Sequence, residues 1–246
     1  MRISEVVPHT LRSMDHASTE GREWLAELYA PARENHVRLN MVTSLTGAAV
    51  GADGTSETLT SPVDRAVLGV IRRACDVVVV GAQTVRAEGY VIPRTAMLAI
   101  LTGSGDLSGH RFDEAAAAER VLVVCPPARV DGVRERVRGT SIEVISAGAD
   151  DDASASHRVD PGAVIERLRD RGLRRVVCEG GPSLAAQFVR AGAVDEACVS
   201  VAPTLSPAER PFIDVDADTR SHVSGMLVDE AGFSYLRLAL DRPAPS

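Results

Sequence analysis

Runs of branched apolar residues alternate along this chain with segments whose apolar positions recur every three or four residues. Val77–Val80 is an unbroken run of four valines, and the segment from Pro62 to about Ala74 has helical periodicity. A continuous apolar run indicates a strand buried on both faces, which is typical of parallel sheets covered by helices. The pattern therefore predicts an α/β fold, a three-layer sandwich with a mostly parallel central sheet and helices on both faces.

The first part of the chain has a weaker pattern. Residues 1–35 are predicted to be an irregular lead-in that carries one amphipathic helix. Apolar residues between Trp24 and Tyr29 share one face of this helix, and Pro31 ends it. We expect residues 36–246 to form a single domain, because no internal repeat and no long linker interrupts the alternation.

Two helices have explicit start signals. Ser61 and Asp160 each stand in an N-cap position before a proline, which is favoured at the first helical position. The other expected helices cover Thr84–Arg86 and Pro182–Ala191, and the other strands lie near Val37–Val42, Met97–Leu101, Arg120–Cys125, Ile142–Ile145, Arg175–Cys178 and Ala197–Val201. Strands near Ser224–Val228 and Phe233–Leu240 are predicted to pair as a hairpin, which gives the sheet an antiparallel C-terminal edge.

Two loops stand out between these elements. Ser44–Thr60 is rich in Gly, Thr and Ser, and loops of this length inside a compact domain are often functional. Asp150–Ser154 is acidic and polar, so we expect a solvated loop there.

Glycines follow two of the apolar runs directly. Gly81 comes after the four valines, and Gly180 with Gly181 comes after the strand expected at Arg175–Cys178. Glycine allows a backbone to approach a ligand closely, and the start of a helix presents unpaired N–H groups to an anion. The two junctions together indicate a nucleotide phosphate site at one edge of the sheet.

Composition and charge narrow the choice of ligand. The chain has 246 residues, 45% of them hydrophobic, and a formal net charge of −7, so nucleic acid and anionic membranes are unfavourable partners. The 27 basic residues are all arginine, which excludes a P-loop lysine and a Schiff-base lysine. A small molecule is therefore the expected ligand.

The four cysteines and the N-terminus indicate the compartment. Cys75, Cys125, Cys178 and Cys198 occur singly in apolar stretches, so we expect buried, reduced thiols and no metal or disulfide framework. The first residues contain no apolar signal core, and no apolar run is long enough to span a bilayer. We expect a soluble, cytoplasmic protein.

Several blocks arrive in a specific order along the chain. They are Asn40–Gly47, Ser61–Arg65, Gly81–Tyr90, Glu179–Leu184, Val194–Glu196 and Ala202–Pro203. In order and spacing they resemble the pyrimidine reductases of riboflavin biosynthesis, the C-terminal reductase domain of RibD, whose fold is similar to dihydrofolate reductase. The resemblance covers roughly residues 36–240, and the zinc deaminase domain that often precedes this reductase has no motif here.

The resemblance implies an NADPH-dependent oxidoreductase. Its reaction would reduce 5-amino-6-ribosylaminouracil 5′-phosphate to the ribitylamino form by hydride transfer to C1′, with no metal. It also implies a homodimer, for which the apolar C-terminal strands offer an interface. Fold analogy alone does not fix the substrate.

The resemblance assigns cofactor-binding residues to the two glycine junctions. Thr84 would donate its hydroxyl to the pyrophosphate, and the backbone at the second junction would hold phosphate. The full set is Gly81, Thr84, Val85, Thr102, Ser104, Glu179, Gly180, Gly181, Pro182, Ser183 and Leu184. Glu179 is also a catalytic candidate, since a carboxylate at the strand end can orient substrate or relay a proton, although it can equally cap its own turn.

The substrate-binding candidates are Asn40, Ser44, Ser61, Asp64, Arg86 and Arg94. Arginine binds phosphate through paired donors, which is why Arg86 and Arg94 are included. Ser61 and Asp64 fit helix capping equally well, so both interpretations stay open at this point.

One residue departs from the family pattern. The family commonly has aspartate where this chain has Thr46, and a threonine hydroxyl holds its proton too tightly for acid catalysis. Thr46 remains a catalytic candidate as a hydrogen-bonding group. Asp53, which lies in the same loop, takes the place of the missing aspartate only if the loop folds back. Three hypotheses follow: the riboflavin-pathway reductase, an NADPH-dependent reductase of a dihydropterin or another heterocycle, and a non-catalytic NADPH-binding paralogue.

Overall fold

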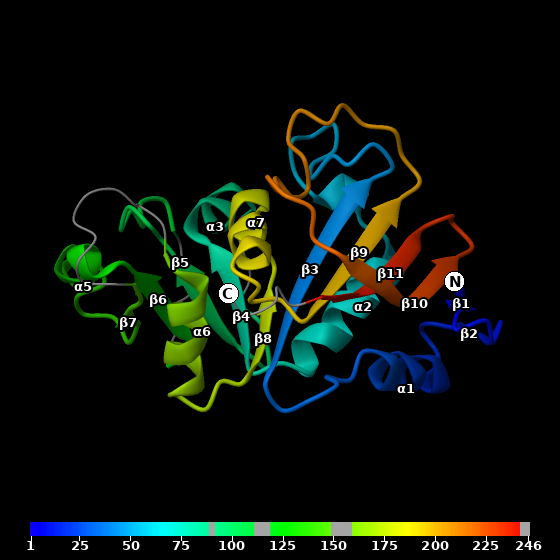
Figure 1. The fold of residues 1–246 in the computed structure, drawn as a ribbon, viewed down its shortest axis with the longest axis horizontal. Coiled ribbons are helices and arrows are strands. Elements are labelled where there is room, and N and C mark those ends of the chain that lie inside the picture. The colour runs from blue at the N-terminus through cyan, green and yellow to red at the C-terminus, as the bar shows by residue number, and fades with distance from the viewer. Residues whose placement is uncertain (89–91, 111–118, 149–158, 242–246) are drawn as a thin grey trace.

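The computed structural model describes residues 1–88, 92–110, 119–148 and 159–241. These residues form one eleven-stranded sheet with helices packed against both faces (Figure 1). The strand order is β2-β1-β10-β11-β9-β3-β8-β4-β5-β6-β7. The predicted loop at 150–154 lies outside the described residues.

A parallel block makes up the centre and one edge of the sheet. Its neighbouring strands are β9 (Glu196–Ala202), β3 (His36–Ser44), β8 (Arg175–Cys178), β4 (Val77–Gly81), β5 (Met97–Leu101), β6 (Val121–Cys125) and β7 (Glu143–Ser146). The sequence predicted β3 from its alternation of apolar and polar residues and the other strands from their apolar residues, and the structure confirms all of them and the mostly parallel arrangement.

The other edge of the sheet is antiparallel. It contains β10 (Ser221–Asp229) and β11 (Ser234–Leu240), which form the predicted hairpin, and β11 pairs with β9. Beyond β10 lie β1 (Arg2–Val7) and β2 (Ser13–Asp15). The prediction of an irregular lead-in is wrong for these two strands. Glu5 is buried beside Ile3 on β1, and an acid in an inward position disguises the apolar alternation of a strand.

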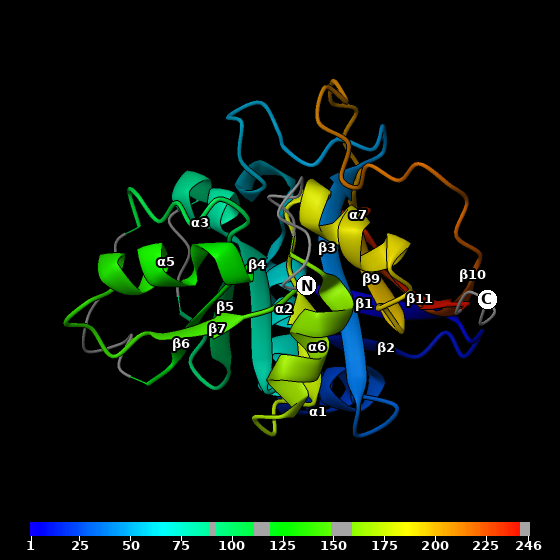
Figure 2. The same ribbon diagram turned by 60° about the vertical axis from the view of Figure 1, so that its left-hand side comes forward.

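Helices cover the two faces of the sheet separately (Figures 1 and 2). One face carries α1 (Thr19–Leu28), α2 (Pro62–Arg73), α3 (Ala82–Glu88) and α5 (Val130–Arg136), and the other carries α6 (Pro161–Arg169) and α7 (Pro182–Arg190). Two short 3₁₀ helices are η1 (Glu57–Leu59) and η2 (Pro127–Arg129). The sequence did not predict α5, because Val133 is its only buried residue and seven residues with one apolar contact carry little periodicity.

The four-valine run joins the two cores. Val77 and Val79 pack with α6 and α7, whereas Val78 and Val80 pack with α1 and α2, and all four are fully buried. Successive residues of a strand point to opposite faces, so a strand between two helical layers needs apolar residues at every position.

The start of α2 confirms the predicted cap. Ser61 Oγ accepts a hydrogen bond from the Asp64 N–H at 3.0 Å, with Pro62 at the first helical position. At α6, Asp160 Oδ1 accepts from the Gly162 N–H at 2.9 Å.

Loops gather at the carboxyl edge of the parallel strands. Segment 45–60, after β3, lies beside segment 203–220, after β9 (Figure 1). The Leu45 N–H donates to the Thr204 carbonyl at 2.9 Å, and the Ala49 N–H donates to the Arg210 carbonyl at 2.8 Å. Ligands of open α/β sheets bind at this edge, so these loops border the expected site.

Candidate active site

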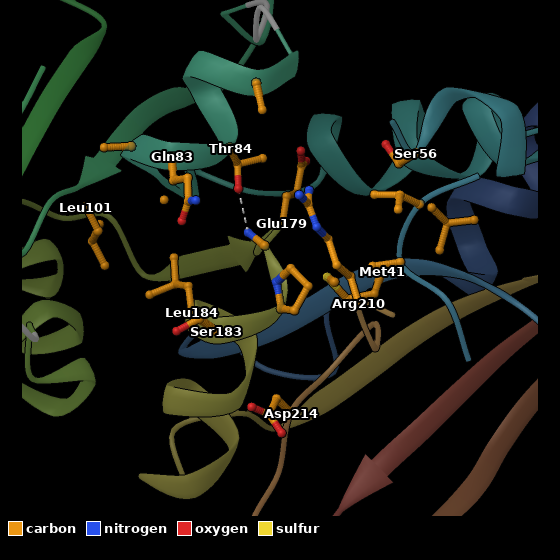
Figure 3. Close-up of a pocket in the computed structure, with 18 of the residues that line it drawn as sticks. Met41, Ser56, Gln83, Thr84, Leu101, Glu179, Ser183, Leu184, Arg210 and Asp214 are labelled. Carbon is orange, nitrogen blue, oxygen red and sulfur yellow. Dashed lines mark hydrogen bonds between the residues drawn. The ribbon is translucent and has the colours of Figure 1, made fainter. Parts of the chain in front are cut away.

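The two glycine junctions are joined directly. Parallel pairing of β4 with β8 places Val79 opposite Cys178, so Gly81 and Gly180, each two residues further along, come next to each other. The Gly81 N–H donates to the Gly180 carbonyl at 2.9 Å. The Gly181 N–H donates to Thr84 Oγ1 at 2.8 Å, as the dashed line in Figure 3 shows. The structure therefore brings the two glycine junctions together, as the sequence pattern predicted.

Close packing requires glycine at the second junction. Gly180 has a φ of +80°, and a Cβ at this residue would lie 2.8 Å from Met41 Sδ on β3. A Cβ at Gly181 would lie 3.0 Å from Thr84 Oγ1. The peptide bond between Gly180 and Gly181 is cis. The backbone thus approaches its neighbours more closely than residues with side chains can.

A cavity of about 860 Å³ opens above these junctions. Residues from the ends of β3, β4, β5 and β8, the starts of α3 and α7, and both loop segments line it (Figure 3). Of the predicted cofactor residues, the lining includes Gly81, Thr84, Thr102, Ser104, Glu179, Gly181, Pro182, Ser183 and Leu184. Gly180 is not among the lining residues, but its carbonyl accepts a hydrogen bond from the N–H of Gly81, which lines the cavity.

Val85 does not reach the cavity. It is buried against the α2 side of the sheet, in the cluster that contains Val78 and Val80. Successive residues of an α-helix point about 100° apart, so Thr84 faces the cavity and the next side chain faces the core. The expectation that Val85 is a cofactor-binding residue is therefore not supported by its position.

Glu179 forms an ion pair that the sequence analysis missed. Arg72 Nε donates to Glu179 Oε1 at 2.7 Å, and Arg72 Nη2 donates to Oε2 at 2.6 Å. Both residues line the cavity, and the Glu179 side chain is only 7% exposed. Burial lowers the pKa of Arg72, but the hydrogen bonds and charge of Glu179 outweigh burial and raise it overall. Arg72 is therefore charged, and the Arg72–Glu179 ion pair forms part of the cavity wall.

Asp64 is the second acid at the wall. It lines the cavity, is 7% exposed, and hydrogen-bonds with Ser200 on β9. Burial raises its pKa, while the hydrogen bond from Ser200 acts in the opposite direction. Ser61 is also buried, but its Oγ contacts the Asp64 N–H and, at 2.8 Å, the Tyr235 hydroxyl. Ser61 is thus a helix cap outside the cavity lining, and Asp64 faces the cavity.

The arginines differ from the sequence expectation. Arg86 lines the cavity and pairs with Asp106, with 3.2 Å between Nη1 and Oδ2. Arg94 is exposed and outside the cavity lining, so its predicted substrate contact is not supported by its position. Arg210 lines the cavity from the segment after β9 (Figure 3), and no ion pair to it occurs within the described residues. Nothing in the local sequence around Arg210 signals this role.

The loop after β3 contains the remaining predicted residues. Asn40 lines the cavity, but Ser44 and Thr46 do not. Ser44 Oγ lies 2.8 Å from Thr46 Oγ1 and accepts from the Ala48 N–H at 3.0 Å. Thr46 Oγ1 also accepts from the Ser206 N–H at 3.0 Å and donates to the Ser206 carbonyl. Thr46 therefore holds two loops together, and the structure does not place it where a catalytic group would act.

Asp53 does not compensate for Thr46. Its carboxylate accepts hydrogen bonds from the Thr55 N–H at 3.0 Å and from the hydroxyls of Thr55 and Thr58. Asp53 is exposed and lies outside the cavity lining. Its role is to shape its own turn.

The donor set at the junctions fits a dinucleotide. The nine-residue helix α7 begins at the cavity with no side-chain cap at Gly181, and Ser183 supplies a hydroxyl there. Thr84 accepts from Gly181, which leaves its own O–H free to donate. Backbone N–H groups at a helix start and adjacent hydroxyls are the groups that hold phosphate. Among the described residues, no group of three His, Cys, Asp or Glu side chains is arranged to hold a metal.

Comparison with known proteins places the chain in a family. Residues 35–221 match the RibD C-terminal domain. The chain is 30% identical over 222 residues to the 2,5-diamino-6-ribosylamino-4(3H)-pyrimidinone 5′-phosphate reductase of Methanothermobacter thermautotrophicus, covering 84% of this chain and 91% of that protein. It is 32% identical over 184 residues to the riboflavin biosynthesis protein RibD of Mycobacterium tuberculosis, covering 75% of this chain and 46% of that longer protein.

A solved structure has the same fold. It is a pyrimidine reductase-like protein from Corynebacterium diphtheriae, with a TM-score of 0.74 and 24% identity, covering 89% of this chain and 99% of that one. The glycine junctions, the cavity above them and the match over most of the chain lead to one conclusion: this protein belongs to the RibD C-terminal domain family.

Proposed function

We propose that this chain is an NADPH-dependent reductase that converts the ribosylamino group of a pyrimidine 5′-phosphate into the ribitylamino form. The observation that carries the proposal is the cavity at the joined glycine junctions, whose lining includes the buried polar residues Asp64 and Thr102. Its Methanothermobacter relative is named as a reductase of this substrate class. The uracil form of the substrate is our first expectation, and the diaminopyrimidinone form is its close analogue.

The cofactor would lie along the α7 side of the cavity. The start of α7, Thr84 and Ser183 would hold the pyrophosphate. Thr102 and Ser104, at the end of β5, would meet the adenosine end with its 2′-phosphate. Bound in this way, the dinucleotide would supply a hydride to the substrate.

The substrate would lie between the cofactor and the two loop segments. Asn40 and Asp64 line this side, and Arg210 offers a guanidinium for the substrate phosphate. Arg72 and Glu179 form the floor between the two ligands. The role of the chain is then mainly to position two partners, which is a large source of rate enhancement.

The first test is loss of NADPH absorbance with 5-amino-6-ribosylaminouracil 5′-phosphate, run beside its 2,5-diaminopyrimidinone analogue and dihydrofolate. Turnover of either pyrimidine supports the proposal, and the faster one identifies the substrate. Turnover of dihydrofolate alone would favour the heterocycle reductase. NADPH binding without turnover of any substrate would favour a non-catalytic paralogue. An NADH arm tests the choice of cofactor.

We further propose a homodimer. Leu236, Leu238 and Leu240 alternate along β11 with side chains that remain half-exposed, and a sheet face of this kind is a typical subunit interface. Light scattering should give about twice the chain mass of 26.0 kDa. A monomer mass would contradict the dimer and leave the reductase proposal intact.

We place the protein in the cytoplasm. All four cysteines are buried free thiols, which fits a reducing compartment and confirms the predicted burial. Within the described part of the chain, none of the helices has the length and apolar character needed to cross a bilayer.

A further inference from the structure

We propose that Asp64 is the catalytic acid of this cavity, the group that gives a proton to the substrate while hydride reaches its carbon. The inference rests on the proposed function and assigns a residue to its proton transfer. Asp64 is the third residue of α2, lines the cavity and is almost completely buried.

The other carboxyl groups of the cavity are less suited to give a proton to a ligand. Both Glu179 carboxylate oxygens accept hydrogen bonds from the Arg72 guanidinium and face that cation. Glu209 and Asp214 lie in the exposed segment after β9, outside the buried part of the wall. Asp64 is the remaining carboxyl among the described lining residues, and within them it has no ion pair.

The surroundings of Asp64 favour its neutral form. Burial is the largest influence and raises its pKa, and the charge of Glu57 acts in the same direction. The hydrogen bond from Ser200 and the charge of Arg65 lower it, but Arg65 is itself paired with Glu57 on the exposed side of the helix. The balance raises the pKa of Asp64 above that of an exposed aspartate, which favours its proton-bearing form.

Ser61, Tyr235 and Asp229 form a chain of buried hydrogen bonds near Asp64, but they do not receive the Asp64 proton. Tyr235 on β11 lies 2.8 Å from Ser61 Oγ and donates its hydroxyl to Asp229 Oδ2 at 2.7 Å. Asp229 Oδ1 is satisfied by the N–H groups of Ala231 and Phe233. Burial raises the pKa of Tyr235, so its hydroxyl remains neutral. The exit for the Asp64 proton is therefore the cavity.

Proton transfer from Asp64 completes the reduction of the substrate, with atoms and electrons balanced. In the ring-opened substrate, C1′ is doubly bonded to the exocyclic nitrogen. As the C1′–H bond forms from hydride, the π electron pair of the C1′=N bond moves onto the nitrogen. That nitrogen takes the Asp64 proton as the O–H bond breaks. The substrate is reduced by two electrons, the dinucleotide is oxidised by two, and the Asp64 carboxylate regains a proton from water.

The test compares Asp64→Asn with wild type and with Asp131→Asn, a control that removes a fully exposed carboxylate on α5. Asparagine keeps the shape and the helix-start position, so NADPH affinity should be unchanged. The value of kcat should fall about a hundredfold or more, the range for loss of a general acid. In wild type, kcat should fall as pH rises through the Asp64 pKa, and this limb should be absent in Asp64→Asn.

Ser200→Ala keeps the test decisive if Asp64→Asn folds poorly. Ser200 is a positioning residue whose hydrogen bond lowers the Asp64 pKa, so its loss should move the limb of the pH profile to higher pH. If wild type is active and Asp64→Asn is fully active, or if the pH profile of Ser200→Ala does not shift, the role of Asp64 as catalytic acid is overturned. The proposed reductase activity is then unaffected. A wild type that binds NADPH but reduces neither pyrimidine overturns the proposed function and the acid together.

Discussion

The backbone N–H of Gly181 donates to the hydroxyl of Thr84 at 2.8 Å, across two segments that are 97 positions apart in the chain. One hydrogen bond thus fixes the start of α7 relative to the start of α3. It also orients the threonine, because an oxygen that accepts from Gly181 turns its own O–H elsewhere. In the proposed complex, that direction is toward the cofactor pyrophosphate.

Thr84→Val tests this arrangement. Valine has the shape of threonine but can neither accept from Gly181 nor donate to phosphate, so NADPH affinity should fall at least about tenfold, the value of one lost hydrogen bond. Thr84→Ser keeps the hydroxyl and should bind nearly as wild type does. Fluorescence titration of NADPH measures both. Equal affinity in the valine variant would contradict a phosphate role for Thr84.

Gly180→Ala tests the close approach at the second junction. The substitution is strained at φ +80°, and its Cβ would also collide with Met41 Sδ. Gly172→Ala is a matched control, because Gly172 has a φ of +78° and open space around it. The control should lose about 1–2 kcal/mol of unfolding free energy and keep its NADPH affinity. Gly180→Ala should lose more stability and also bind NADPH weakly, and equal losses in chemical denaturation would show that Met41 moves aside freely.

Sequence patterns located the central features because local chemistry sets them. Four consecutive valines can be satisfied only between two apolar layers, and the residues of a strand–glycine–helix junction are neighbours in the chain. The serine cap of α2 is likewise local, with Ser61 contacting Asp64 three residues on. These features need no knowledge of the rest of the fold.

Other features depend on contacts between distant segments. Arg72 and Glu179 are 107 positions apart, and the β4–β8 pairing helps to bring α2 and the end of β8 together. Family resemblance suggested catalysis for Thr46, but its hydroxyl binds Ser206, 160 positions away. Successive residues of an α-helix point about 100° apart, so Thr84 and Val85 face different directions. This geometry alone argues against Val85 as a cofactor-binding residue once Thr84 is assigned to the cofactor.

The Arg72–Glu179 pair predicts an asymmetric double-mutant cycle. Arg72→Met leaves the Glu179 carboxylate buried without its cation and should cost about 2–4 kcal/mol of unfolding free energy. Adding Glu179→Gln removes the uncompensated charge, so the double variant should be more stable than Arg72→Met alone. Arg73→Met, at the exposed neighbouring position, should have little effect. Additive losses would show that the two side chains are not coupled.

Asp76 predicts how stability depends on acid. Its Oδ2 accepts from the N–H groups of Arg174 and Arg175 at 3.0 and 2.8 Å, and its Oδ1 accepts from Arg175 Nε at 3.1 Å. Burial alone would raise the Asp76 pKa, but these hydrogen bonds and the Arg175 charge lower it overall from 3.8. A carboxyl whose folded pKa is depressed stabilises the fold above its unfolded pKa, and this contribution disappears as pH falls through the folded pKa.

Asp76→Asn should therefore be less stable than wild type at neutral pH, by about 1–2 kcal/mol for the lost charge-assisted hydrogen bonds. The difference should stay constant down to about pH 5 and then shrink as wild-type Asp76 is protonated. Urea unfolding at a series of pH values measures it, with Asp131→Asn as the control for an exposed carboxylate. A difference that persists unchanged into strong acid would mean that Asp76 acts through packing, and its charge would then contribute nothing to holding the start of β4 against β8.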